Sequence, residues 1–324
     1  MARARPTSLL PHDPQGSRLA AVFPGQGSQY AGMADPWLTH EAGRSVLEEC
    51  SSAVGLDLAE VCRDADALAR TDLVQPALFA CDVAAFRVLE SEAIQPTVVA
   101  GHSLGEYAAL VAAGVLDLQS TARAVAERGA ATHEAAQSHP GAMTALVGVS
   151  PEDAAELCSM AGRGDVLAIA NENSASQTVL SGTVAAVERA EALARTRNVK
   201  AVRLKVEGAF HSPLMQPALD RVRRAIAGLE FREPRFAVVP NASGRPTTSR
   251  HEIRDLLSRQ LLSPVRWSRT MDSIAEFSVD TVIEAGPSDV LTRLARRSIP
   301  GVRAVAVGSP DDARSVVTRE AATP

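Results

Sequence analysis

Aromatic residues are scarce in this 324-residue chain, at 3% of the sequence, and Trp37 and Trp267 are its only tryptophans. Hydrophobic residues nevertheless make up 46% of the chain, which is enough for a large core. That core must consist mainly of Ala, Val, Leu and Ile, the residues that a parallel sheet covered by helices buries. The length allows one large domain or two smaller ones.

Cysteine is also rare, and its spacing excludes two classes of site. The four cysteines are Cys50, Cys62, Cys81 and Cys158, and they form no Cys-x-x-Cys pair. Neither a zinc site nor a disulfide framework is therefore expected. We expect isolated buried thiols and no bound metal.

Long uncharged apolar runs and a strongly basic composition are absent as well. No segment resembles a membrane span, and the start, Met1-Ala2-Arg3-Ala4-Arg5-Pro6, is not followed by a signal-peptide core. The formal net charge of -5 argues against a general nucleic-acid binder. We expect a soluble, cytoplasmic protein without a membrane or nucleic-acid partner.

The most informative feature present is the pentapeptide Gly101-His102-Ser103-Leu104-Gly105. It follows an apolar run at 97–100 and precedes an Ala- and Leu-rich segment at 106–110, so the pattern predicts a strand, a sharp turn and a helix. In such a nucleophile elbow the glycines permit the tight turn, and the helix start directs free N–H groups towards the serine. Ser103 is the candidate nucleophile, and the alternative is a purely structural turn.

His211 is the candidate general base. It lies within Gly208-Ala209-Phe210-His211-Ser212-Pro213, just after a strand-like run at 201–206. A serine hydroxyl needs a base with a pKa near the operating pH, and imidazole meets that need. The alternative is a loop histidine with local hydrogen bonds only. We expect the His102 side chain to diverge from Ser103 and to have a supporting role. The remaining histidines lack comparable settings: His12, His40, His133, His139 and His251.

A third, acidic member of a hydrolase triad is missing. No Asp or Glu between Ser103 and His211 lies in a distinctive turn of its own. This suggests a Ser-His pair in which a backbone carbonyl or an amide side chain orients the imidazole.

These motifs, together with Phe23-Pro24-Gly25-Gln26-Gly27-Ser28-Gln29, give the chain a recognisable order of elements. The sequence resembles the malonyl-CoA:acyl carrier protein transacylases and the acyltransferases of polyketide synthases, including discrete, trans-acting ones. Further matching stretches are Glu127-Arg128-Gly129, Asn171-Glu172-Asn173-Ser174, Pro240-Asn241-Ala242-Ser243-Gly244-Arg245-Pro246, Gln260-Leu261-Leu262-Ser263-Pro264-Val265-Arg266-Trp267 and Glu284-Ala285-Gly286-Pro287. The resemblance covers most of the chain.

The resemblance implies roles for several residues. Ser103 carries the acyl group as an ester, and His211 acts as general base and acid. The backbone around Gln260 is implied as the partner of the second imidazole nitrogen. The N–H groups of Leu104 and Gln26 would bind the oxyanion, where each such donor contributes a few kcal/mol. Gln26 could alternatively be only a loop residue.

Two more side chains are implied to select the substrate. Arg128 would form a two-pronged pair with the free carboxylate of a malonyl group. Its helical surroundings alone would favour a solvated or Glu-paired surface residue. Phe210 resembles the malonyl-selecting form of the polyketide acyltransferase motif, in which a bulky ring excludes a branched unit. Gly208 departs from the commonest malonyl form of that motif.

The hydrophobic pattern predicts an α/β fold with a parallel sheet. Strands are expected at 19–23 and 279–283, and an apolar helix at 77–89. Strands that alternate with helices indicate a parallel α/β sheet, and the resemblance implies an α/β-hydrolase-like large domain. We assign it residues 18–141 and 207–308, with an N-terminal extension at 1–17 and a C-terminal tail at 309–324. Each end is either a flexible arm or a packed extension.

Residues 142–206 have a different rhythm. Strands are expected at 143–149, near 166–170, at 178–182 and at 201–206, with one helix opened by Ser150-Pro151 and a second, Ala/Glu/Arg-rich helix. Strand-helix-strand-strand-helix-strand is the ferredoxin-like order. This predicts an inserted small subdomain, and the resemblance implies a site between the two parts, with Asn171 or Asn173 lining one side.

The leading hypothesis is a malonyl-CoA:carrier-protein acyltransferase of fatty acid or polyketide biosynthesis. Its alternatives are an editing acyl hydrolase, a transferase for another acyl or extender unit, and a non-catalytic carrier-binding protein. The resemblance implies no bound cofactor, coenzyme A thioester as substrate, and an acidic carrier protein whose phosphopantetheine thiol accepts the acyl group. A monomer is expected. Candidate steering cations are Lys200, Arg203, Lys205, Arg221, Arg223, Arg224, Arg293, Arg296 and Arg297.

Overall fold

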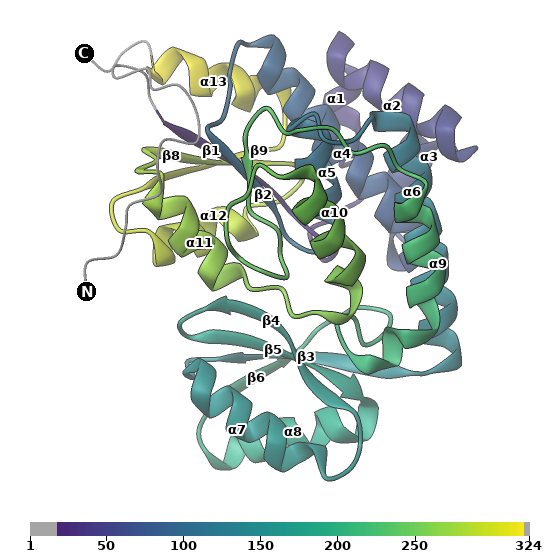
Figure 1. Cartoon of the computed structure of the whole chain (residues 1–324), viewed down its shortest axis with the longest axis vertical. Coiled ribbons are helices and arrows are strands. Elements are labelled where there is room, and N and C mark those ends of the chain that lie inside the picture. Colours follow the sequence, from purple (N-terminus) through teal and green to yellow (C-terminus); the bar gives the residue numbers. More distant parts are fainter. Residues whose placement is uncertain (1–17, 321–324) are drawn as a thin grey trace.

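The larger part of the molecule is built on a parallel sheet of five strands, with the order β7-β2-β1-β8-β9 (Figure 1). The computed structural model describes residues 18–320, so the predicted extension at 1–17 lies outside the described residues. The strands of this sheet are β1 (Leu19–Phe23), β2 (Val98–Gly101), β7 (Ala237–Val238), β8 (Thr281–Ala285) and β9 (Arg303–Val307). The predicted parallel α/β sheet is confirmed.

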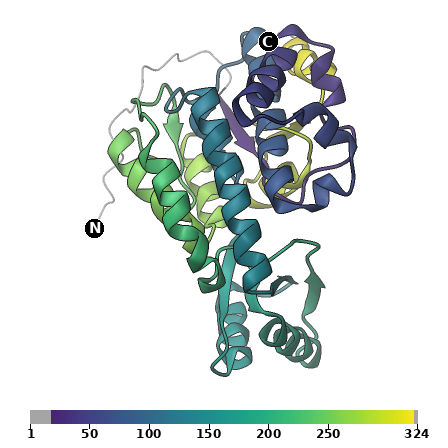
Figure 2. The ribbon, with the colours of Figure 1, turned by 90° about the vertical axis from the view of Figure 1, so that its right-hand side faces the viewer.

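Helices cover both faces of this sheet, as the two views of the ribbon show (Figures 1 and 2). Alternate residues of β1 enter two different cores: Ala21 and Phe23 pack with α4, and Ala20 and Val22 pack with α11 and α12. A strand buried on both faces reads as a continuous apolar run, which explains Leu19–Phe23. The helices of this part are α1 (Asp35–Leu38), α2 (Glu41–Val54), α3 (Leu58–Arg63), α4 (Thr71–Ser91), α5 (Gly105–Ala112), α6 (Leu118–Ser138), α9 (Gln216–Ala227), α10 (Arg250–Arg259), α11 (Trp267–Glu276), α12 (Val290–Ser298) and α13 (Pro310–Glu320), with short 3₁₀ turns η1 (Ala67–Ala69), η2 (Pro213–Met215) and η3 (Gln260–Leu262).

Helix α4 begins six residues before the predicted start at 77 and contains Pro76. Its first amide, that of Thr71, donates to a carboxylate oxygen of Glu207 across 3.1 Å. A carboxylate at a helix N-terminus satisfies a free N–H and is favoured by the helix dipole. Because this cap is 136 residues away in the chain, the local pattern could not reveal the true start.

The smaller part is a separate antiparallel sheet with the order β4-β5-β3-β6. Its elements are β3 (Gly141–Val147), α7 (Pro151–Gly162), β4 (Leu167–Ser174), β5 (Gln177–Thr183), α8 (Val184–Thr196) and β6 (Lys200–Arg203). They follow one another in the predicted order, and the Ser150 hydroxyl caps α7 by accepting from the Asp153 amide at 3.1 Å. The expected last strand, 201–206, is too long, because β6 ends at Arg203 and the chain turns towards His211.

Two further features concern the ends of the large part. Helix α6 runs from beside the parallel sheet down to the start of β3, and so links the two sheets (Figure 2).

The segment after Gly308, described up to residue 320, forms α13. Buried Ala313 and Val316 pack α13 into the main core, so this stretch is a packed extension.

Candidate active site

The nucleophile elbow requires both of its glycines. A Cβ on Gly101 would lie 1.9 Å from the Gly105 carbonyl oxygen, and one on Gly105 would lie 2.2 Å from the Phe23 carbonyl oxygen. Neither position therefore has room for a side chain, and at Gly105 the turn packs directly against β1. Ser103 lies in the turn between β2 and α5 and has a φ of 52°, in the left-handed region, as the serine of a nucleophile elbow does.

Ser103 and His211 form a hydrogen-bonded pair, with 2.7 Å between Oγ and Nε2. The other ring nitrogen of His211, Nδ1, lies 2.9 Å from the Ser263 carbonyl oxygen and 3.2 Å from that of Gln260. Carbonyl oxygens only accept, so Nδ1 carries the proton and donates it. Nε2 therefore presents a lone pair to the serine hydroxyl. The backbone around Gln260 is thus the partner of this nitrogen, and the nearer of the two carbonyls is that of Ser263.

His211 is held neutral by its surroundings. It is 4% exposed, and burial, the charge of Arg128 and the proximity of His102 lower its pKa to about 3. Burial disfavours the charged imidazolium, and a neighbouring cation does the same. In the substrate-free protein at neutral pH the imidazole is therefore uncharged, and its Nε2 lone pair is free to accept the serine hydrogen bond.

Arg128 is buried beside the pair, at 2% exposure, so the alternative of a solvated surface arginine is wrong. It comes from α6, and its Nη2 lies 3.3 Å from Ser103 Oγ. Its Nη1 donates to Gln75 Oε1 at 2.5 Å, and its guanidinium carbon lies 5.8 Å from the centre of the Tyr107 ring. The cation is thus directed at the space beside the serine oxygen. Gln75 had not been identified, although it is a polar residue in the apolar run of α4.

The amides of Leu104 and Gln26 are free to donate. Among residues 18–320 neither backbone N–H has a hydrogen-bond acceptor. The first loop is pressed against the elbow, since a Cβ on Gly25 would lie 2.5 Å from the His102 carbonyl oxygen. The Gln26 side chain turns elsewhere and donates to Thr71 Oγ1 at 3.1 Å. The main chain of Gln26 is thus the part available to a ligand.

Asn241 clamps the elbow and was not predicted to act there. Its Oδ1 accepts from the Ser103 amide at 2.6 Å, and its Nδ2 donates to the Gly101 carbonyl at 2.6 Å. The asparagine is 1% exposed. A buried amide that satisfies both sides of a strained turn fixes its shape. The stretch Pro240-Asn241 was noted in the sequence, but no local signal indicated this contact.

Asn171, Asn173 and Phe210 take different positions. Asn173 Oδ1 lies 3.0 Å from His102 Nε2, which joins the small sheet to the elbow and agrees with a supporting role for His102. Asn171 is the β4 residue between the two backbone hydrogen bonds to Val265, and it makes no hydrogen bond to Ser103. Phe210 is 8% exposed and packs in the main core.

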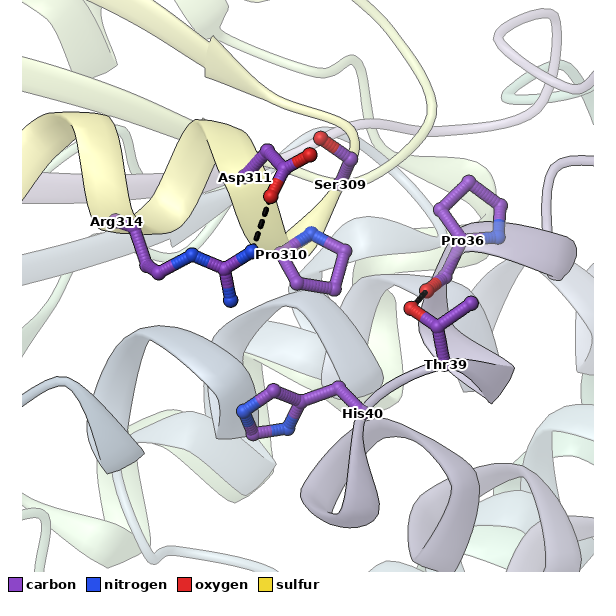
Figure 3. Close-up of a pocket in the computed structure, with 7 residues that line it drawn as sticks. All are labelled: Pro36, Thr39, His40, Ser309, Pro310, Asp311 and Arg314. Atoms are coloured by element: carbon purple, nitrogen blue, oxygen red, sulfur yellow. Dashed lines mark hydrogen bonds and ion pairs between the residues drawn. The ribbon is translucent and has the colours of Figure 1, made fainter.

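Two pockets lined by described residues lie away from Ser103. One, of about 300 Å³, lies between the start of α2 and the N-terminus of α13, where His40 faces the Asp311–Arg314 ion pair (Figure 3). The other, of about 440 Å³, lies between α2 and α3. Within residues 18–320 no cluster of His, Cys, Asp or Glu could hold a metal ion, and no helix is long and apolar enough to cross a membrane.

A family model described as "Acyl transferase domain" matches residues 21–318. The chain belongs to the acyl transferase family. A relative named malonyl CoA-acyl carrier protein transacylase, from Haemophilus influenzae, is 38% identical over 296 residues, which cover 90% of this chain and 95% of that protein. The Escherichia coli K12 protein of the same name is 38% identical over 299 residues, 91% of this chain and 97% of its own.

Solved structures of acyl transferases agree with the fold. The malonyl CoA-acyl carrier protein transacylase of Coxiella burnetii superimposes with a TM-score of 0.90 at 36% identity, covering 94% of this chain and 98% of that one. A malonyl-transacylase in complex with its type II polyketide synthase acyl-carrier protein gives a TM-score of 0.89 at 37% identity, covering 94% and 100%. The resemblance drawn from the motifs is confirmed.

Proposed function

We propose that this protein transfers a malonyl group from coenzyme A to the phosphopantetheine thiol of an acyl carrier protein, through an ester on Ser103. The observation that carries the proposal is the 2.7 Å Ser103–His211 pair with the buried Arg128 guanidinium 3.3 Å from the same hydroxyl. Relatives named for malonyl CoA and acyl carrier protein support this substrate pair.

The first half-reaction loads the serine. As Ser103 Oγ attacks the thioester carbonyl, its proton passes to Nε2 of His211. The carbonyl oxygen gains a negative charge, which the N–H groups of Leu104 and Gln26 stabilise. When the intermediate collapses, the C–S bond breaks, the coenzyme A sulfur takes the proton from Nε2, and the malonyl ester remains on Ser103.

The second half-reaction reverses these roles. The phosphopantetheine thiol gives its proton to His211 Nε2 and attacks the ester carbonyl. The Ser103–acyl bond then breaks, and Ser103 Oγ regains a proton from the imidazolium. The Ser263 and Gln260 carbonyls accept the Nδ1 proton throughout, which keeps the ring in the required orientation.

Substrate selection is proposed for Arg128 and Phe210. The guanidinium pairs with the free carboxylate of the malonyl unit, so acyl groups without that carboxylate lose a charge-assisted contact. The Phe210 ring limits the room for a branched unit. Asn171 and Asn173 line the opposite side, where residues 142–206 face the parts made by 18–141 and 207–308.

The proposal includes no bound cofactor, a transient complex with an acidic carrier protein, a monomeric state and a cytoplasmic location. Several candidate steering cations already have acidic partners: Arg203 with Glu191, Arg221 with Glu127 and Glu134, and Arg293 with Asp289. Lys205 is exposed, has no acidic partner among residues 18–320, and lies six residues before His211 in the chain. We place carrier contact on the Lys205 side.

Intact mass after brief exposure to malonyl-, methylmalonyl- and acetyl-CoA tests the function. We expect a malonyl adduct that is absent from Ser103→Ala and that moves to an added carrier protein. Rapid release of free acid without transfer would instead indicate an editing hydrolase. A preferred adduct from another thioester would indicate a different acyl or extender unit.

A further inference from the structure

Glu106 is a buried acid directly behind the nucleophile elbow. It lies in the first turn of α5 and is 1% exposed. Its Oε2 accepts two hydrogen bonds, from Gln260 Nε2 at 2.8 Å and from the Asn241 amide at 3.2 Å. Its Oε1 is buried and has no partner among residues 18–320. A buried carboxylate is costly unless it is hydrogen-bonded and its charge is compensated.

Both partners of Glu106, Gln260 and Asn241, also contact Ser103. The Gln260 amide donates to the Ser103 carbonyl at 2.7 Å, and its Oε1 lies 3.5 Å from Arg128 Nη2. Asn241 forms the clamp on the Ser103 amide described above. Because Glu106 binds the N–H side of the Gln260 amide, the oxygen of that amide must face Arg128. The carboxylate thus fixes what surrounds both the nucleophile and the cation.

Charge also links Glu106 to Arg128. Arg128 has no acid within ion-pairing distance in the described chain, and Glu106 is the carboxylate whose charge acts on it. Burial raises the pKa of Glu106 to about 7, opposed by Gln260, the Asn241 amide and Arg128. The other titratable groups nearby are uncharged at neutral pH, because burial raises the pKa of Tyr107 to about 12 and lowers those of His211 and His102.

We propose that Glu106 is a positioning residue that serves as the internal counter-charge of Arg128, and that it gains a proton when the free carboxylate of the acyl group binds there. This inference rests on the proposed function. When the acyl carboxylate pairs with Arg128 while Glu106 behind it is still charged, one negative charge in the buried site is uncompensated, which favours protonation of Glu106. Binding of one acyl carboxylate to a site with a charged Glu106 is thus accompanied by the uptake of one proton from solvent.

Calorimetry tests this in the full-length Ser103→Ala protein, which cannot be acylated. Malonyl-CoA and acetyl-CoA are titrated in two buffers of different ionisation enthalpy, at pH values on both sides of 7. We expect proton uptake approaching one per malonyl-CoA above pH 7 and none with acetyl-CoA. The affinity ratio of malonyl- to acetyl-CoA should fall with rising pH, by up to about tenfold per unit, while the coenzyme A phosphates cancel in the ratio.

Glu106→Gln should abolish the proton uptake and make the affinity ratio independent of pH. The matched control Glu127→Gln, next to Arg128 in sequence but on the surface, should keep both the uptake and the pH dependence. Uptake that persists in Glu106→Gln would assign the proton to another group such as His211 and overturn the proposal. So would a ratio independent of pH.

Infrared difference spectra provide a measurement that needs no Glu106 variant, should that variant not fold. Malonyl-CoA labelled with ¹³C in its free carboxylate should produce an unlabelled carboxylic acid C=O band, and acetyl-CoA should not. No such band would overturn the inference. Absence of malonyl-CoA binding altogether would instead reject the proposed function, so the two failures are distinguishable.

Discussion

Ser103 and His211 meet through a 2.7 Å hydrogen bond, and both have left-handed backbone, with φ of 52° and 58°. A non-glycine residue in this region costs about 1–3 kcal/mol, and persists where surrounding contacts impose it. Asn241 imposes it on the Ser103 side. On the other side, the Ser212 hydroxyl donates to the Ala209 carbonyl and the Ser263 carbonyl accepts from the ring. These hydrogen bonds therefore fix the relative positions of Ser103 and His211.

Replacing Gly105 should disrupt this geometry. Gly105→Ala places a Cβ 2.2 Å from the Phe23 carbonyl oxygen, so the elbow must move away from β1. We expect the free energy of unfolding to fall by about 1–3 kcal/mol, with loss of Ser103 acylation. Urea unfolding and intact mass measure the two effects. The control Gly162→Ala, whose nearest neighbour is 4.0 Å away, should be neutral or slightly stabilising. Equal behaviour of the two variants would contradict the close-packing argument.

Removing the buried cation should change substrate preference. Arg128→Ala is expected to lower kcat/KM for malonyl-CoA by roughly 10- to 150-fold while acetyl-CoA loses much less, because only the malonyl group has a free carboxylate. Competition between the two thioesters measures the ratio directly. Arg123→Ala, an exposed arginine of the same helix, is the control and should not alter it. An unchanged ratio in Arg128→Ala would remove the carboxylate role.

Lowering the pH to the ordinary pKa of histidine should not protonate His211. Because the pKa of His211 is lowered to about 3, the neutral base persists as the pH falls through about 6.5. Reaction of Ser103 with phenylmethanesulfonyl fluoride, which has no carboxylate, should therefore show no half-point near that pH. A half-point near 6.5 would show that the imidazole titrates normally.

The same shift has a consequence for stability. Between about pH 3 and 6.5 the unfolded chain binds a proton at His211 and the native chain does not. This residue's contribution to the free energy of unfolding is thus fully present above pH 6.5 and decreases as the pH falls. Chemical unfolding of the wild type and His211→Gln across that range should show a smaller pH slope in the variant.

Shortening Phe210 should admit a branched extender. Phe210→Ala is expected to raise the methylmalonyl-to-malonyl ratio of kcat/KM by roughly 5- to 150-fold, which corresponds to about 1–3 kcal/mol for one methyl group. The cavity itself costs about 3–5 kcal/mol of stability. Phe236→Ala has the same 8% exposure and controls for that loss. The steric role would be rejected if both variants kept the wild-type ratio.

Two lysines allow a test of carrier docking. Lys205 follows β6 on the side that leads to His211, whereas Lys200 lies at the other end of that strand, opposite Val147. Lys205→Glu should raise KM for the carrier by about 2- to 5-fold without slowing Ser103 acylation, since an exposed charge contributes about 1 kcal/mol or less. Lys200→Glu should have no effect. The reverse order would move the docking surface to the far end of the sheet.

Much of the fold followed from local sequence. The continuous apolar run Leu19–Phe23 is typical of a strand buried on both faces, and Gly101 and Gly105 on either side of Ser103 favour the turn between strand and helix. The Ser150 cap and the order of elements around it predicted the small sheet. These signals involve neighbouring residues, for which steric limits and helix capping leave few choices.

The tertiary structure alone decided the surroundings of the serine. Arg128 is buried and Arg123 is exposed on the same helix because of how α6 packs against α4. Ser263, Asn241 and Glu106 join the site through hydrogen bonds that span 52, 138 and 154 residues. Their roles arise from burial, where a polar group must find a partner and a charge feels its neighbours strongly, and burial is a property of the folded chain.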